Sequence, residues 1–114
     1  MSDRELLELA AKAAGWFAFD WLSWDGVLNV YSIDGMHEKF DPLNDDGDAL
    51  RLAVKLHINI QHSATLPDLL PSIEAYGTED ITSESVEEMI GVDPCAATRR
   101  VIVRAAAEIG RAMP

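Results

Sequence analysis

The sequence predicts an α+β fold, with three helices packed on a small, mostly antiparallel sheet in the order helix, hairpin, helix, strands, helix. Three segments carry apolar residues at helical spacing and begin at residues that commonly cap helices. Short runs between them alternate apolar and polar residues, as half-buried strands do. With 114 residues the chain is long enough for one core, so we expect a single domain over residues 1–114.

The first helix is predicted to start at a capping box. Ser2 is followed three residues later by Glu5, so the two residues can satisfy each other's free amides. An apolar-periodic segment then runs to Gly15, which is a suitable left-handed terminator.

An aromatic-rich hairpin is predicted to follow the first helix. The alternation from Phe17 to Trp21 places the aromatic residues on one side, which we expect to face the core. Asp25-Gly26 is a dipeptide that two-residue hairpin turns favour, and a turn there would place Trp21 opposite Val30. We expect residues 36–40 to add a short strand.

The second helix is predicted to begin at the acidic turn F-D-P-L-N-D-D-G-D. Asp46 or Asp48 is the expected cap, because either carboxylate could accept bonds from the free amides of the first turn. Leu50, Ala53 and Val54 recur at helical spacing and are expected to form the apolar face.

The stretch from residue 57 to residue 91 gives weaker structural signals. Strands are expected over residues 57–61 and 72–76, while residues 82–90 could form a short helix or a loop. The segment 63–91 is the acidic, loop-rich part of the domain.

The last helix is predicted to open at Asp93-Pro94, with the aspartate as cap and the proline where its missing amide costs nothing. Its small residues would allow close approach to neighbouring helices. The residues expected on its apolar face are Thr98, Ile102, Ala105, Ile109 and Met113. The opposite side carries Arg100, Arg104 and Arg111.

The charge balance limits the classes of partner. Nine Lys and Arg residues face twenty Asp and Glu residues, giving a formal charge of −11. Such a chain repels phosphate backbones and anionic lipids, so we expect no direct binding to nucleic acid or membranes. The single cysteine and the polar start of the chain, without a signal-peptide pattern, predict a cytoplasmic protein.

Three blocks resemble a small phage-encoded family, the phage ABA sandwich domain. They are D-R-E-L-L-E-L-A-A-K-A-A-G from Asp3 to Gly15, D-P-L-N-D-D-G-D-A-L-R-L-A-V-K-L from Asp41 to Leu56, and D-P-C-A-A-T-R-R-V-I-V-R-A-A-A-E-I-G-R-A-M from Asp93 to Met113. The stretch from His57 to Val92 has no such match. The resemblance implies a phage or prophage origin and a sheet packed by helices, but no activity, because the family has none assigned.

Residues that could carry chemistry are few, and each has a simpler structural explanation. The acidic turn lacks the glutamate of a calcium loop, since Ala53 would occupy that position. His57 and His62 lack zinc-ligand spacing and are interpreted as partly exposed. Cys95 is expected to be a small buried residue. We therefore predict no catalytic residue, metal or cofactor; a hydrolase using Cys95 or His57 is the enzymatic alternative.

Acidic residues are the main candidates for partner binding. No Lys or Arg lies between Lys55 and Arg99, and we expect this stretch to contact a host or phage protein with a basic surface. The candidate residues are Asp68, Glu74, Glu79, Asp80, Glu84, Glu87, Glu88 and Trp24. The leading hypothesis is a non-enzymatic, anti-CRISPR-like anti-defence inhibitor that occupies a basic nucleic-acid-binding groove. The alternative is a phage assembly accessory that self-associates, for example as a homodimer, through the last helix or a sheet edge.

Overall fold

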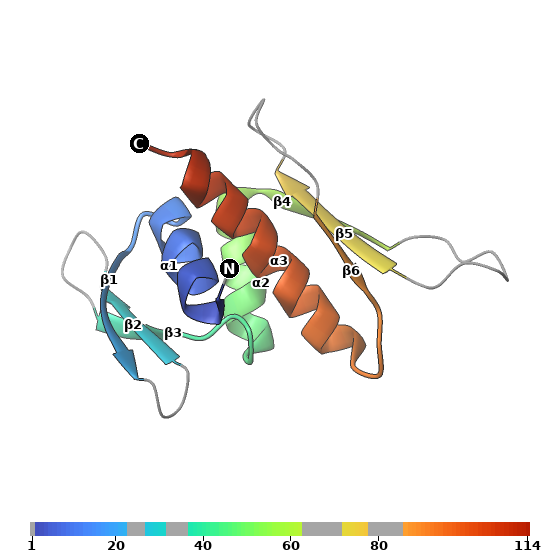
Figure 1. The fold of residues 1–114 in the computed structure, drawn as a ribbon, viewed down its shortest axis with the longest axis horizontal. Helices are drawn as coiled ribbons and strands as arrows, with labels where there is room; N and C mark the ends of the chain where they lie inside the picture. Colours follow the sequence, from blue (N-terminus) through green and yellow to red (C-terminus); the bar gives the residue numbers. More distant parts are fainter. Residues whose placement is uncertain (1, 23–26, 32–36, 63–71, 78–85) are drawn as a thin grey trace, which may run out of the picture.

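Three helices lie between two antiparallel sheets of three strands each (Figure 1). The computed structural model describes residues 2–22, 27–31, 37–62, 72–77 and 86–114, and from residue 17 to residue 38 it describes the backbone alone. The predicted α+β class, the antiparallel pairing and the order of the elements are confirmed. The strands form two sheets on either side of the helices, where the sequence suggested one.

Local sequence signals set the start of α1 (Asp3–Ala13) and of α3 (Pro94–Ala112). The Ser2 hydroxyl accepts a hydrogen bond of 3.2 Å from the amide three residues further on, as the capping box predicts. Gly15 follows α1 with a φ of 80°, the predicted left-handed conformation. Asp93 caps α3 in the same way as Ser2 caps α1, which also confirms the prediction.

Small residues let α1 and α3 pack closely. Ala10 and Ala11 of α1 and Ala106 of α3 are fully buried. Gly110 lies against the carbonyl group of Leu9, where an added Cβ would stand only 2.0 Å from the oxygen. The Ala-rich side of α3 is therefore used inside the chain, and the predicted self-association through this side is not supported.

Helix α3 is buried over a wider arc than its sequence pattern predicted. Ile102 and Ala105 are buried as expected, but Val101 and Val103 are fully buried too. Met113 lies past the end of the helix and is 39% exposed, so its placement on the apolar face is wrong. The cause is that α3 packs against α1 on one side and against the second sheet on the other (Figure 1).

The first sheet has the order β1-β2-β3, with bounds Phe17–Leu22, Val27–Tyr31 and His37–Phe40. The third strand was predicted, but the hairpin register was not: Trp21 lies opposite Leu28 instead of Val30. Four residues, 23–26, separate β1 from β2 where a two-residue turn was expected, and this moves the pairing by two positions. The predicted turn itself, and the aromatic side chains expected to face the core, lie outside what the structure describes.

Helix α2 (Asp46–Leu56) is capped by a residue that the sequence did not single out. Asp45 accepts a hydrogen bond of 2.8 Å from the amide of Asp48. Asp48 in turn accepts one from the amide of Asp41, at 3.0 Å. The prediction of Asp46 or Asp48 as cap is wrong, because the helix already begins at Asp46.

The buried side of α2 also differs from the prediction. Ala49, Leu52 and Ala53 face the core, whereas Leu50 and Val54 are 61% and 68% exposed. Both sets satisfy helical spacing, so spacing alone could not choose between them. Two apolar side chains are thus left on the surface of the helix.

The second sheet has the order β4-β5-β6, with bounds Ile58–His62, Ser72–Gly77 and Val86–Met89. The strands expected near residues 57–61 and 72–76 are confirmed. The prediction of a short helix or a loop over residues 82–90 is wrong for the part that the structure describes, because residues 86–89 form a strand that pairs with β5. His57 stands before β4 as the left-handed cap of α2, with a φ of 54°.

Buried residues from helices and both sheets form one connected core, including Leu7, Phe40, Ile73 and Val103. Within the described part of the chain, no helix is long and apolar enough to cross a membrane.

Candidate functional site

The second sheet has one face toward α3 and one face without a covering element among those described (Figure 1). Along β5, Ile73 and Ala75 are fully buried and face the core, so Glu74 and Tyr76, both half-buried, point outward beside the buried Ser72. On β6, Glu87 is exposed and Met89 is 51% exposed. We call this outward side, composed of Asn59, Gln61, Glu74, Tyr76, Glu87 and Met89, the carboxylate face.

Two glutamates stand directly opposite each other at the centre of this face. The antiparallel register pairs Glu74 of β5 with Glu87 of β6 and with Gln61 of β4. Side chains in such a pair have Cβ atoms roughly 5 Å apart, and like charges there destabilise the sheet. Among the described residues, neither glutamate forms an ion pair.

The arginines, in contrast, are all neutralised by carboxylates of the same chain. Each of the six lies within 4.0 Å of an Asp or Glu oxygen. The pairs are Arg4 with Glu8, Arg51 with Asp45 and Asp48, Arg99 with Asp46, Arg100 with Asp3 and Glu88, Arg104 with Glu88, and Arg111 with Glu108. Arg100, Arg104 and Arg111, which the sequence placed on one side of the last helix, therefore balance acidic neighbours, and each guanidinium group is already engaged.

Glu88 belongs to this internal network. It alternates with Glu87 along β6 and points toward α3, where it lies 3.1 Å from Arg100 and 3.3 Å from Arg104. Arg104 also donates a 2.8 Å hydrogen bond to the backbone carbonyl of Glu87, which fixes β6 to the helix. Of the predicted partner-binding residues, Glu88 thus has a structural role.

The remaining predicted partner-binding residues divide into two groups. Glu74 and Glu87 come together on the carboxylate face. The others lie outside the described residues: Asp68, Glu79, Asp80, Glu84 and Trp24.

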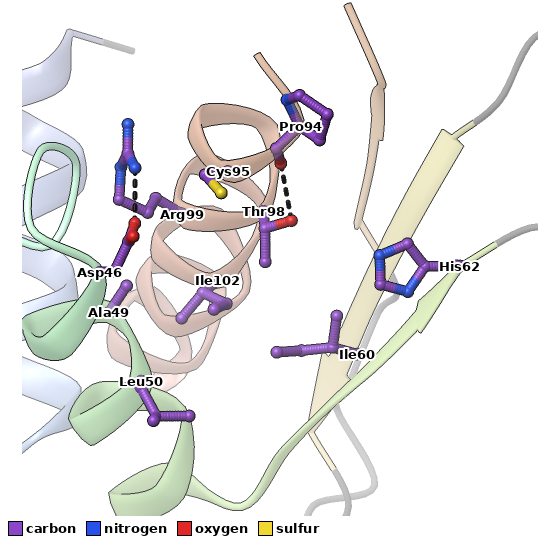
Figure 2. Close-up of a pocket in the computed structure, with 10 residues that line it drawn as sticks. All are labelled: Asp46, Ala49, Leu50, Ile60, His62, Pro94, Cys95, Thr98, Arg99 and Ile102. Carbon is purple, nitrogen blue, oxygen red and sulfur yellow. Dashed lines mark hydrogen bonds and ion pairs between the residues drawn. The ribbon is translucent and has the colours of Figure 1, made fainter.

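An open groove of about 320 Å³ lies on the other side of the second sheet, between α2, α3 and β4 (Figure 2). Figure 2 shows Leu50 of α2 and Ile60 of β4 on opposite walls, with Ile102 of α3 between them. The lining residues are Asp46, Ala49, Leu50, Ile60, His62, Pro94, Cys95, Thr98, Arg99 and Ile102. Apolar atoms dominate the walls, so the groove suits an apolar side chain better than a charged group.

Arg99 closes one end of this groove by joining α3 to the start of α2. Its side chain is 15% exposed and donates to the Leu43 carbonyl at 2.9 Å and to the Asp46 carboxylate at 2.6 Å. The hydrogen bond to Asp46 raises the pKa of Arg99 above its usual value, although burial acts in the opposite direction. The positive charge of Arg99 therefore contributes its full stabilisation of the folded protein at any pH below the usual arginine pKa. This stabilisation is lost only when the pH rises through the raised pKa of the folded state.

Cys95 is exposed at the rim of the groove, so the expectation of a buried thiol is wrong. Its position in the first turn of α3 places it outside the packed arc of that helix. His62 lines the same groove, whereas His57 caps α2. Within the described residues, no group of three or more His, Cys, Asp and Glu side chains could hold a metal ion.

Trp16 is partly buried and packs at the edge of the core. Its ring meets Phe40 edge to face, with ring centres 5.4 Å apart, and the Lys55 ammonium lies 5.9 Å from its centre. These contacts give Trp16 a structural role.

The groove was missed by sequence reasoning, although one signal was available. Leu50 and Val54 lie four residues apart, and each is followed by a basic residue, Arg51 and Lys55. Such apolar residues can lie at the boundary between a buried and a solvated side. The residues of β4 and α3 that form the other walls of the groove come together only through long-range packing, which no local sequence pattern predicts.

Comparison with known protein families, with characterised proteins and with solved structures finds no match. The phage or prophage origin stays a prediction from the sequence blocks described above.

Proposed function

We propose that this protein is a phage- or prophage-encoded binding protein that acts without catalysis by docking its carboxylate face on a basic surface of a host protein complex. The observation that carries the proposal is the direct pairing of Glu74 with Glu87 in the register of β5 and β6. The contrast with the arginines strengthens it, because the chain neutralises every guanidinium group and leaves these two glutamates without an ion pair among the described residues.

The electrostatic energy of Glu74 and Glu87 differs between the free and the bound state. In the free protein the two carboxylates repel each other across the strands, which costs stability. A lysine or arginine from a partner placed between them would replace this repulsion by attraction. The gain is electrostatic, so salt should weaken the association.

The favoured target is a groove that normally binds nucleic acid. Such grooves gather Lys and Arg to neutralise phosphates, and a protein of charge −11 is attracted to them over long distances. In the specific version that we propose, the protein blocks the nucleic-acid site of a host defence complex, as an anti-CRISPR-like inhibitor would.

Self-association in a phage assembly is the second candidate. It is favoured by the positions of β4 and β6, each of which has one side without a neighbouring strand among the described elements. Light scattering at high protein concentration tests it, and a strict monomer would remove this candidate.

A capture experiment tests the proposed function. Tagged protein is incubated with a lysate of a bacterial host at low and at high salt, and bound proteins are identified by mass spectrometry. We expect a basic nucleic-acid-binding complex to be retained at low salt, lost at high salt and displaced by duplex DNA. Loss of retention in Glu74→Gln/Glu87→Gln would assign the contact to the carboxylate face.

A matched variant controls for net charge. Glu5→Gln/Glu8→Gln removes the same two charges from the surface of α1, which is not part of the β4–β6 sheet, and glutamine is compatible with the capping box. This variant should be retained like the wild type. Equal loss in both double variants would show that the total charge matters and that the carboxylate face does not.

A further inference from the structure

A pocket of about 220 Å³ lies on the opposite side of α2 from the groove, between this helix, the residues that follow α1 and the end of β3. Its apolar walls include the buried side chains of Phe40 and Leu52 and the partly buried ring of Trp16. The rings of Trp16 and Phe40 meet edge to face, with centres 5.4 Å apart. An apolar cavity of about 150 Å³ can hold a benzene molecule, so this pocket has room for one ring with a short substituent.

Helix α2 places three charged residues along this pocket, at the spacing of successive turns: Asp48, Arg51 and Lys55. The Asp48 carboxylate is satisfied within the chain, because it accepts the amide of Asp41 at 3.0 Å and pairs with Arg51. Arg51 is engaged as well, since Asp45, which does not line the pocket, lies 3.8 Å from its guanidinium group. These charges therefore compensate each other without a ligand.

Lys55 supplies the charge that the chain does not compensate. Among the described residues, no carboxylate oxygen lies within 4.0 Å of its ammonium group. The ammonium group lies 5.9 Å from the centre of the Trp16 ring, so it stands beside an apolar wall of the pocket. A single negative charge placed here would gain an ion pair, whereas a positive charge would be repelled by Lys55.

We infer that this pocket binds a small carboxylate that carries a single aromatic ring. The ring packs against Trp16 and Phe40, and the carboxylate accepts a hydrogen bond from the Lys55 ammonium group. One lysine without an internal partner matches one negative charge, and the volume of the pocket matches one ring. The site does not include any residue of the carboxylate face, so the inference stands independently of the proposed function.

An NMR titration of the ¹⁵N-labelled protein tests the inference, because chemical shifts report weak binding and also its place. The probe is phenylacetate. Phenylacetamide has the same shape without the charge, and cyclohexylacetate keeps the charge without the aromatic ring. We expect phenylacetate to cause saturable shifts at the amides of Trp16, Phe40 and Leu52, and none at those of Ile60 and Ile102, which line the groove.

Phenylacetate should bind about three- to tenfold more tightly than phenylacetamide, because only its carboxylate forms an ion pair with the exposed Lys55. It should bind about twofold or more tightly than cyclohexylacetate, because the aromatic ring adds to the contact with Trp16 and Phe40. These two comparisons separate the contribution of the charge from that of the ring.

Lys55→Met keeps a side chain of similar length and removes the charge. It should weaken phenylacetate binding about three- to tenfold and leave phenylacetamide binding unchanged. Lys39→Met is the matched control, since Lys39 precedes Phe40 on β3 but is exposed and does not line the pocket. This variant should bind phenylacetate like the wild type, and the spectrum of each variant shows in the same experiment whether it is folded.

Several results would overturn the inference. The first two are the absence of saturable shifts with phenylacetate and shifts centred on Ile60 and Ile102, which would place the ligand in the groove. Equal affinities for phenylacetate and phenylacetamide, or equal effects of Lys55→Met and Lys39→Met, would show that Lys55 does not hold the carboxylate. Cyclohexylacetate that binds as tightly as phenylacetate would contradict the preference for an aromatic ring.

Discussion

At the residue scale, Gly110 sets how closely α1 and α3 approach. A side chain at position 110 would collide with the Leu9 carbonyl group. The two helices can therefore pack this closely only because residue 110 is a glycine. Arg99 has the complementary role, because its long side chain bridges α3 to the start of α2 through two hydrogen bonds. Both residues act on helix packing, and each permits a sharp mutational test.

Gly110→Ala should destabilise the protein by about 2 to 4 kcal/mol, because the new methyl group would collide with a backbone carbonyl that cannot rotate away. Urea unfolding measures the change. Gly91→Ala is the control, since a Cβ added to Gly91 would meet no atom within 4 Å, and it should stay within about 0.5 kcal/mol of the wild type. Similar stabilities for the two variants would contradict the close helix contact.

Arg99→Lys should cost about 1 to 2 kcal/mol, since an ammonium group cannot reproduce the planar fork that reaches both Leu43 and Asp46. Asp46→Asn should cost less than about 1 kcal/mol, because the Asp46 side chain is 70% exposed and its ion pair is solvated. Thermal unfolding of both variants tests this order. A larger loss in Asp46→Asn would show that the ion pair, and not the bond to the carbonyl, dominates.

At the element scale, the start of each helix shows what a local sequence can specify. Ser2 was predictable as a cap from the Glu three residues later, and Asp93 from the proline that follows it. The acidic turn offered several aspartates in a row, and the choice of Asp45 depends on where residues 41–45 are held by the rest of the fold. A cap with a single candidate can thus be predicted from the local sequence, whereas the choice among several candidates depends on the tertiary structure.

Asp45→Ala should lower the free energy of unfolding by about 1 kcal/mol, because the amide of Asp48 loses its acceptor. Asp45→Asn should retain most of the stability, since asparagine caps nearly as well. Chemical denaturation distinguishes them. If alanine and asparagine were equally tolerated, Asp45 would not be the functional cap.

Strand β6 illustrates a different limit of sequence reasoning. Residues 86–89 carry two adjacent glutamates and little β propensity, and they form a strand because β5 and α3 hold them through the ladder and the Arg100 and Arg104 contacts with Glu88. The groove walls at Leu50 and Ile60 could not be predicted either, because these residues come together only in the folded chain.

Glu87→Lys should stabilise the protein by about 0.5 to 1 kcal/mol, because it turns the repulsion with Glu74 into an attraction. Glu87→Gln should give a smaller gain, since it removes only the repulsion. Both should weaken capture of a basic partner, so stability would rise while binding falls. Unfolding curves that show no gain in either variant would contradict the unfavourable pairing on this face.

At the scale of the whole molecule, the charge is unevenly used. Asp46 ties α2 to α3 and Glu88 ties β6 to α3 through arginine, while the centre of the outward sheet face keeps two glutamates side by side. The sequence showed the excess of negative charge and the cation-free stretch, but it could not separate Glu88 from Glu87. Strand register makes that distinction, since it points one residue inward and the next outward.

The measurement that tests the central claim most directly is carboxylate footprinting of the protein alone and bound to the basic complex that it captures. Exposed carboxylates are coupled to an amine with a carbodiimide and quantified by mass spectrometry. We predict that the partner protects Glu74 and Glu87 while Glu5 and Glu8 react equally in both states. Equal reaction of Glu74 and Glu87 with and without the partner would contradict docking through the carboxylate face.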